Sequence, residues 1–428
     1  MPTLASQIDG PWLRGEAISA EAARVVREAM IFEHCKWDPQ VGDVPVLHPA
    51  ALILRRETWN ELAQLAENMD AEIREAERAI LASPAALREL GLPWSLRRAL
   101  VSAGATSSAA DGSFRVSRFD FHHTGEGWRV SEVNSDVPGG YIESSGFAAE
   151  MAAHYPSATP TGDPAAALVA ALRAAHPTGA RVGLVHATAY TDDRQVMVFL
   201  SRRLTAAGFE TVLLAPDSLR WRNGRAETLD GGALDHLFRF FPAEWLPNLG
   251  WRSGWKNFTR PDGTPQANPP SAIVSQSKRF PLACRRLGLR LPTWDALVPE
   301  TRDPRQVQAA ELDAWVLKPA LGRVGEDIGI AGATGPRELV KIRRAARRHA
   351  PHWAAQRRFS ALPWNTDRGV FFPCIGVYVV NGLAAGVYGR VAPRPLIDSH
   401  AQDVAVLLEP TSPASHVSAE APVENFPP

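Results

Sequence analysis

Apolar positions between residues 59 and 80 recur every three or four residues, at Trp59, Leu62, Leu65, Met69, Ile73, Ala76 and Ile80. This spacing places the apolar side chains on one face of a helix and the polar side chains on the other. The pattern therefore predicts an amphipathic helix over this segment. We expect the N-terminal part of the chain, residues 1–110, to be mostly helical.

Two β-rich segments follow a loop of small residues. Residues 114–121 (FRVSRFDF) and 128–134 (WRVSEVN) are rich in aromatic and β-branched side chains, and the glycine-containing turn HHTGEG separates them. Runs of this kind joined by a short turn are typical of a β-hairpin. We assign the hairpin to a unit that spans residues 111–165.

The pattern changes to strand, helix and strand in residues 166–265. The apolar runs RVGLVH (181–186) and FETVLLA (209–215) flank a helical stretch near residues 193–207. Successive β-α-β units usually form a parallel sheet, because a helical crossover joins neighbouring parallel strands. This part of the chain is therefore predicted to be a separate β-α-β subdomain.

From Trp315 onward, short strands alternate with turns and one basic helix near residues 337–349. The candidate strands are WVLKP (315–319) and segments around 353–359, 371–380 and 383–391. This alternation indicates an α+β domain, which we place in residues 266–410. Residues 411–428 are rich in Pro, Ser and Ala and poor in large apolar side chains, a composition typical of a mobile tail.

Composition narrows the class of protein. The chain has 428 residues, 45% of them hydrophobic, and 46 basic residues balance 46 acidic residues. The zero net charge gives no broad attraction to nucleic acid, so we expect no nucleic-acid partner. Three widely spaced cysteines favour a reducing compartment. Neither an apolar leader nor a run of about 18 apolar residues is present, so we expect a soluble, cytoplasmic protein that does not bind membranes.

Common catalytic motifs are missing from the sequence. It contains no GxxxxGK[ST], GxGxxG, HExxH or GxSxG pattern, so nucleotide binding would need another device. His122 and His123 are adjacent on a predicted strand and therefore point to opposite faces. That arrangement suits joint metal binding poorly, and we expect these histidines to be structural or to face solvent.

The hairpin carries polar residues at strand spacing. Arg118 and Asp120 lie two apart on the first strand, and Glu132 and Asn134 lie two apart on the second, so each pair shares a face. Carboxylate and amide oxygens are ligands that Mg²⁺ prefers. The alternative interpretation is an ordinary polar face with charge pairs across the strands.

The wider pattern around these residues resembles a known signature. R-x-D, a short turn and E-x-N-x-D are similar to the metal-binding motif of the glutathionylspermidine synthase family, whose members are circularly permuted ATP-grasp ligases. Three further blocks resemble family segments in the family's order: FRFFPAEWL (238–246), NPPSAIVSQSKRFPLA (268–283) and WVLKPALGRVGEDI (315–328). The resemblance implies an α/β and α+β fold that is ATP-grasp-like and circularly permuted, with a pre-ATP-grasp β-α-β subdomain.

The resemblance also implies a set of site residues. Mg²⁺ would be held by Asp120, Glu132 and Asn134. The catalytic arginines would be Arg118, Arg323 and Arg390. ATP would contact Lys278, Lys318, Gly322, Gly325, Glu326 and Gln356. Val324 departs from the family, which more often has an acidic residue there.

The chemistry implied by this resemblance is ligation. The family activates a carboxylate with ATP and Mg²⁺, passes through an acylphosphate and forms an amide, so no protein nucleophile is needed. The expected partners are a small-molecule acid, either a peptide or an amino acid, and an amine. Because a cationic amine favours carboxylates, Asp136 and Glu143 are candidate ligands for it, and the alternative for Asp136 is a cap of the turn after the hairpin. The alternatives are an ATP-dependent phosphotransferase or ATPase on the same fold and a catalytically inactive binding protein. Nothing in the sequence identifies the substrates or the oligomeric state.

Overall fold

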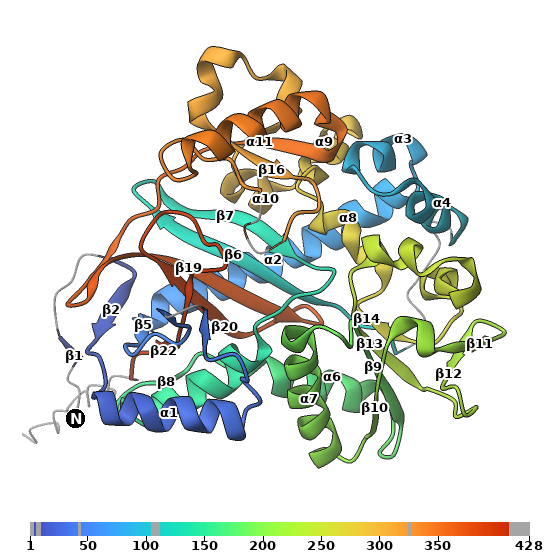
Figure 1. The fold of residues 1–428 in the computed structure, drawn as a ribbon, viewed down its shortest axis with the longest axis horizontal. Coiled ribbons are helices and arrows are strands. Elements are labelled where there is room, and N and C mark those ends of the chain that lie inside the picture. The colour runs from blue at the N-terminus through green and yellow to red at the C-terminus, as the bar shows by residue number, and fades with distance from the viewer. Residues whose placement is uncertain are drawn as a thin grey trace, which may run out of the picture.

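The computed structural model of the chain describes residues 4–5, 10–41, 44–103, 112–323, 325 and 327–410 (Figure 1). Two expectations concern residues outside these ranges, namely Glu326 as a nucleotide ligand and mobility of the tail, residues 411–428. The described part is a mixture of helices and several sheets, which confirms the predicted fold class.

A six-stranded antiparallel sheet forms the centre of the molecule (Figure 1). The predicted hairpin is present, and it joins strands from the C-terminal part of the chain. The order is β21-β20-β19-β6-β7, with β18 paired to β19. The bounds are β6 (Val116–Thr124), β7 (Gly127–Asn134), β18 (Trp364–Thr366), β19 (Gly369–Val380), β20 (Leu383–Ala392) and β21 (Gln402–Val404).

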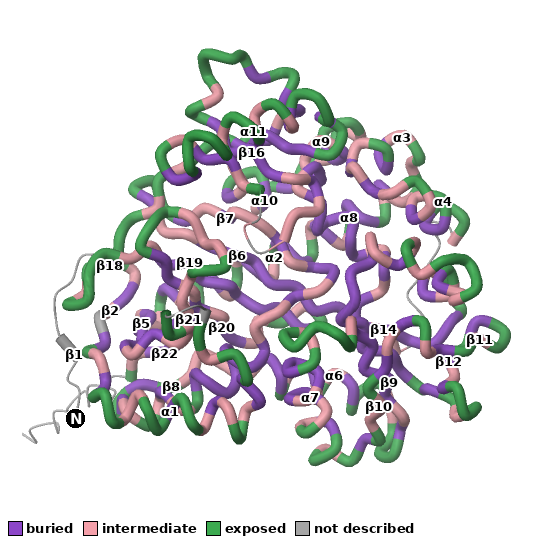
Figure 2. Tube along the Cα trace, viewed as in Figure 1, coloured by how far each residue is buried: buried purple, intermediate pink, exposed green. Residues whose placement is uncertain are grey.

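The predicted amphipathic helix is α2 (Arg56–Leu81), which packs against β19 and β20. Its apolar face is fully buried at Leu62, Met69, Ile73 and Ile80. Figure 2 shows the same contrast between buried central strands and exposed outer segments. One of the two large core clusters therefore lies between this helix and the central sheet, and the other lies around α1 (Ala20–Phe32), α7 (Thr191–Ala206) and the parallel sheet of the β-α-β unit.

Two buried polar links also join α2 to β6 and to the residue just before it. Asp70 accepts a hydrogen bond from Ser117, and Glu77 forms a bidentate ion pair with Arg115. Because buried polar groups cost free energy unless they are paired, these links favour one register between helix and sheet.

The N-terminal part contains strands as well as the expected helices. Its longer helices are α1 (Ala20–Phe32), α2 and α4 (Trp94–Ala103). In addition, β1, β2 and β5 form a five-stranded sheet with β22 and β8 from later in the chain. The bounds are β1 (Leu4–Ala5), β2 (Trp12–Gly15), β5 (Leu52–Leu54), β8 (Thr159–Pro160) and β22 (Val406–Leu408). Parallel pairing of β5 with β22 brings residues near both ends of the described chain together.

The predicted β-α-β unit is present, with a parallel sheet ordered β10-β9-β13-β14. Helix α7 (Thr191–Ala206) connects the first two strands in sequence and packs on both. The strand bounds are β9 (Arg181–His186), β10 (Glu210–Leu214), β13 (His236–Phe240) and β14 (Gln266–Ala267).

A small antiparallel sheet, β15-β17-β16, lies beyond the hairpin, with β15 spanning Thr301–Arg302, β16 Trp315–Pro319 and β17 Trp353–Arg357. The basic helix α11 (Pro336–Arg348) packs against β16 through Ile342 and Ala346. Figure 1 shows this unit on the other side of β7 from the five-stranded sheet.

Asn268, just after β14, ties the β-α-β sheet to the hairpin. Its amide nitrogen donates to the carbonyl oxygens of Val116 and Ser135, each at 2.7 Å, and its amide oxygen accepts from the Val116 nitrogen at 2.7 Å. The side chain is buried, so water cannot replace these bonds. One side chain therefore satisfies backbone groups at the start of β6 and just after β7.

We predict that Asn268→Ala lowers the free energy of unfolding by roughly 2–4 kcal/mol, because it leaves three buried backbone groups without partners. Urea denaturation measures the change. Asn68→Ala, on the exposed side of α2, is the matched control and should change stability by less than about 0.5 kcal/mol. Equal effects of the two substitutions would contradict this role for Asn268.

Candidate active site

The hairpin brings four of the predicted site residues together on one face. Arg118 lies opposite Asn134 and Asp120 lies opposite Glu132 in the strand register, as the two-residue spacing predicts. The Arg118 guanidinium donates to both Asp120 carboxylate oxygens, at 2.7 and 3.0 Å. Asn134 donates to Asp120 at 3.2 Å and to Glu132 at 3.4 Å. The three predicted metal ligands therefore form one oxygen-rich cluster.

A β-bulge in the hairpin directs the backbone carbonyl of Ser131 toward Lys318. Asp120 pairs with Glu132 and Phe121 pairs with Val130, so Ser131 has no partner in the register. Its carbonyl oxygen accepts a hydrogen bond from the Lys318 amine at 2.9 Å. Bulges commonly re-aim groups next to functional sites.

Arg390 on β20 contacts the cluster from across the sheet. Its guanidinium donates to Asp120 at 2.8 Å. Among the residues that the structure describes, the Arg390 Nε atom is buried without a hydrogen-bond partner. A buried cationic donor without a partner is costly, and an anionic ligand would satisfy it.

Two lysines approach from the opposite side. Lys278 lies 3.2 Å from a Glu132 carboxylate oxygen and donates to the carbonyl of Gly322 at 3.1 Å. Lys318, at the end of β16, donates to the Gln356 amide oxygen at 2.7 Å. Both lysines were predicted at this site, and the fold places them across from the hairpin carboxylates.

Charge and burial perturb the titration of this cluster. Burial alone would raise the pKa of Glu132, but Lys278, Arg390 and Lys318 together hold it well below its usual range. Burial lowers the pKa of Lys318 to about 8, against the opposing attraction of Glu132. Strongly shifted groups gathered in one cavity are typical of a functional site.

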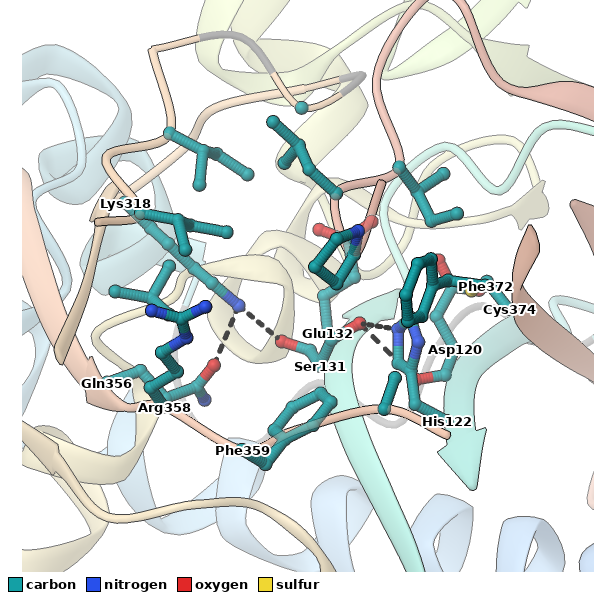
Figure 3. A pocket seen from close by; sticks show the side chains of 18 of the residues that line it. Asp120, His122, Ser131, Glu132, Lys318, Gln356, Arg358, Phe359, Phe372 and Cys374 are labelled. Atoms are coloured by element: carbon teal, nitrogen blue, oxygen red, sulfur yellow. Dashed lines mark hydrogen bonds between the residues drawn. The ribbon is translucent and has the colours of Figure 1, made fainter. Parts of the chain in front are cut away.

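A cavity of about 300 Å³ opens beside the cluster (Figure 3). Charged and polar side chains line part of its wall, among them Asp120, Glu132, Lys318, Gln356, Arg358 and Arg390. Apolar side chains line the rest, among them Val316, Ile330, Phe359, Phe372, Leu396 and Ile397. A cavity with both charged and apolar walls fits a ligand that joins an anionic group to a flat apolar one.

Sequence reasoning missed His122, which lies in the wall of this cavity (Figure 3). Its imidazole contacts Ser131 at 3.0 Å and packs on Phe359 with ring centroids 5.3 Å apart. Burial lowers its pKa to about 4, so it is neutral at pH 7. His123 points the other way, onto Trp12 and Trp128, as adjacent strand positions must. The spacing of two from Asp120 was the signal that could have identified His122.

The glycine loop after β16 shapes one side of the cavity. Gly325 has φ +70°, and a Cβ there would lie 2.5 Å from the Ile397 carbonyl oxygen, so only glycine fits. Gly322 contributes the carbonyl that holds Lys278. Gly322 therefore lies beside Lys278, and Gly325 lies in the cavity wall.

Arg323 points away from the cavity described above. It donates to Glu244 at 2.9 Å and to Asp136 at 3.3 Å, and its guanidinium lies 5.8 Å from the Trp245 ring. These partners come from the FRFFPAEWL segment and from the turn after β7. The structure thus places this predicted catalytic arginine against the β-α-β side of the molecule, apart from the hairpin cluster.

The two carboxylates considered as amine ligands are already occupied. Asp136 is fully buried and accepts from Arg239 at 2.6 Å and from the Ala243 nitrogen at 2.9 Å. Glu143 is buried and paired with Lys36. Neither side chain offers an open carboxylate to an amine in this structure.

A mixed α/β fold whose sheets enclose this cavity belongs to the ATP-grasp-like class of ligase folds. The family model described as glutathionylspermidine synthase preATP-grasp matches residues 37–408, and the chain belongs to this family. This confirms the resemblance identified from the sequence motifs.

Solved structures that match the chain include the following two. A glutathione synthetase-like effector from Globodera pallida aligns with a TM-score of 0.61 and 10% identity, over 91% of this chain and 96% of that one. A putative gamma-glutamylcysteine synthetase from Methylobacillus flagellatus aligns with a TM-score of 0.43 and 12% identity, over 76% of this chain and 88% of the other. No curated protein matches the sequence. Within the described residues, no helix is long and apolar enough to span a bilayer.

We predict that Lys318 makes stability depend on pH. Because its folded-state pKa is about 8 and that of an unfolded lysine is about 10.4, the unfolded chain binds more protons between these values, and the free energy of unfolding rises with pH. From about pH 7.5 to 10, wild type should gain about 2–3 kcal/mol relative to Lys318→Met. Urea denaturation at each pH measures this difference.

Lys341→Met, which removes an exposed lysine of α11, is the control and should follow the wild-type pH dependence. If the Lys318→Met protein also followed it, the lowered pKa of Lys318 would be wrong.

Proposed function

We propose that this protein is an ATP-dependent ligase that joins a small-molecule carboxylic acid to an amine through an acylphosphate. The observation that carries the proposal is the charged cluster beside the cavity. In this cluster, Arg118, Arg390, Lys278 and Lys318 surround the carboxylates of Asp120 and Glu132. Family membership supports the same chemistry.

The charge of this cluster suits magnesium and a nucleoside triphosphate. Four cationic side chains face two carboxylates and Arg358 also lines the cavity, so positive charge is in excess. A divalent cation adds to this excess, which complements the roughly four negative charges of a nucleoside triphosphate. The unpartnered Nε atom of Arg390 independently favours an anionic ligand.

The donor set also fits magnesium. Asp120, Glu132 and Asn134 offer the hard oxygen ligands that this ion takes together with water and phosphate. Bound there, magnesium would neutralise charge on the phosphates. Asp120 is already held by Arg118 and Arg390, so its carboxylate is oriented before any ligand binds.

Other residues of the site contact the phosphates and the base of ATP. Lys278 and Lys318 bind phosphate oxygens from the side opposite the hairpin, and Gln356 orients Lys318. The apolar part of the cavity wall, which includes Phe359 and Ile330, receives the base.

The chemistry then proceeds without a protein nucleophile. A carboxylate oxygen of the acid attacks the terminal phosphorus, the bond to the bridging oxygen breaks, and ADP leaves. The amine nitrogen attacks the acyl carbon, phosphate departs, and the nitrogen loses a proton as the amide forms. Arg118 and Arg390 stabilise the negative charge that develops on the transferred group, which is the usual role of preorganised cations in phosphoryl transfer.

We expect Glu132→Gln to reduce ATP-dependent ADP release on the order of a hundredfold, because the amide loses a magnesium-binding charge. A screen of acid and amine pools with purified protein first identifies a pair that supports ADP release. Glu126→Gln, an exposed residue of the same hairpin, is the control and should retain full activity. Full activity of Glu132→Gln would contradict the metal site, and no ADP release with any pair would favour an inactive binding protein.

Heavy-oxygen labelling tests the intermediate. With the acid labelled in its carboxylate, one labelled oxygen should appear in inorganic phosphate, since that oxygen leaves with the phosphoryl group. Mass spectrometry of the released phosphate measures the transfer. Label in AMP would indicate adenylation instead, and unlabelled phosphate would indicate simple ATP hydrolysis.

A further inference from the structure

Tyr388 on β20 contacts both arginines of the hairpin cluster. The guanidinium carbon of Arg118 lies 5.1 Å from the centroid of its ring, and that of Arg390 lies 5.3 Å away. Both arginines are paired with Asp120. A single aromatic ring therefore supports the two cations that orient this carboxylate, through cation–π contacts.

Glycines on either side make room for this arrangement. Gly376 of β19 lies between Asp120 and Tyr388 in the register, and a Cβ there would come within 2.9 Å of Arg118 Cδ and Asp120 Oδ1. Gly140, with φ +100°, packs against the ring itself, where a Cβ would lie 2.5 Å from a ring carbon. The backbone is thus open where Arg118 crosses β19 to reach the ring.

The hydroxyl group of Tyr388 is tethered on the side away from the cavity. It donates to Asp403 at 2.7 Å, and Asp403 in turn lies 3.0 Å from the Lys36 amine. Lys36 is also paired with Glu143. Lys36 and Asp403 are buried, yet none of the steps of the proposed reaction uses them.

Burying charged groups costs free energy unless every group is paired. We therefore asked what the network of Lys36, Asp403 and Glu143 does for the site. Asp403 is held further through its backbone, which exchanges hydrogen bonds with Val46 and His48 at 2.7 and 2.8 Å. The tether therefore connects the segment after α1 to the tyrosine ring. It limits the movement of the ring and, through it, of both guanidinium groups.

We propose that Tyr388, held by Asp403 and Lys36, is a positioning residue that fixes Arg390, which lines the cavity, against the terminal phosphate of the nucleotide and keeps Arg118 paired with Asp120. This inference rests on the proposed function, because it needs a triphosphate at the hairpin cluster. Long arginine side chains lose much rotamer freedom when they bind an anion. A ring that restrains them beforehand reduces that loss, and the benefit applies only to a ligand that reaches them.

The test compares affinities for the magnesium complexes of ATP and ADP, measured by calorimetry on the full chain. Tyr388→Leu removes the ring and should reduce the preference for ATP over ADP by about tenfold, as expected for lost cation–π support. Tyr388→Phe keeps the ring and loses the tether, so its preference should fall by less than about threefold. Loss of the terminal-phosphate preference is a change that general destabilisation does not produce.

Tyr155→Phe is the matched control. It also removes a buried tyrosine hydroxyl, one that donates to the Glu16 carbonyl at 2.5 Å, but it lies away from the arginines and should leave the preference unchanged. If a folded Tyr388→Leu protein keeps the wild-type preference, the proposal is overturned. If that variant does not fold, Tyr388→Met, which fills similar space without a ring, serves instead, and an unchanged preference there also overturns it.

The result for wild type separates the two proposals. If the wild-type protein binds the magnesium complex of ATP and every variant keeps the wild-type preference for ATP over ADP, the role of Tyr388 is overturned. The ligase proposal is then unaffected. Wild-type protein that binds neither nucleotide overturns the nucleotide site itself and the role of Tyr388 with it.

Discussion

The buried carboxylate of Asp120 is the interaction on which the candidate site depends. A carboxylate that is only 1% exposed is tolerated because cationic and amide donors replace its lost water. Arg118, Arg390 and Asn134 supply those donors from three strands. The two arginines in turn are tolerated in a buried position because Asp120 is there, so each charge requires the others.

On the side of the site opposite the hairpin, the buried amine of Lys318 is a second charge whose burial has a cost. Lys318 is buried beside neutral partners, Gln356 and the Ser131 carbonyl, and burial lowers its pKa. Placing a lysine there costs stability at neutral pH, and a bound polyanion would recover that cost. Functional sites commonly carry such locally unfavourable features, which the rest of the fold supports.

Much of the local structure followed from short-range rules. Helical spacing identified α2, strand spacing identified β6 and β7 together with their shared polar face, and the β-α-β pattern identified β9, α7 and β10. These predictions succeeded because residue spacing determines which side chains share a face of a helix or strand. The pairing of β5 with β22 could not be predicted in this way, since pairing between distant segments has no local signal.

The sequence by itself determined the chemical type of the site: an arginine and oxygen ligands at strand spacing, and lysines next to a glycine loop, because spacing and residue chemistry are local properties. Only the tertiary structure decided which of these groups meet. It placed Lys278 against Glu132, turned Arg323 toward Glu244, occupied Asp136 and Glu143 with internal ion pairs, and put His122 in the cavity wall. Those outcomes depend on how separate sheets pack and on the need to pair every buried charge, which is a property of the whole fold.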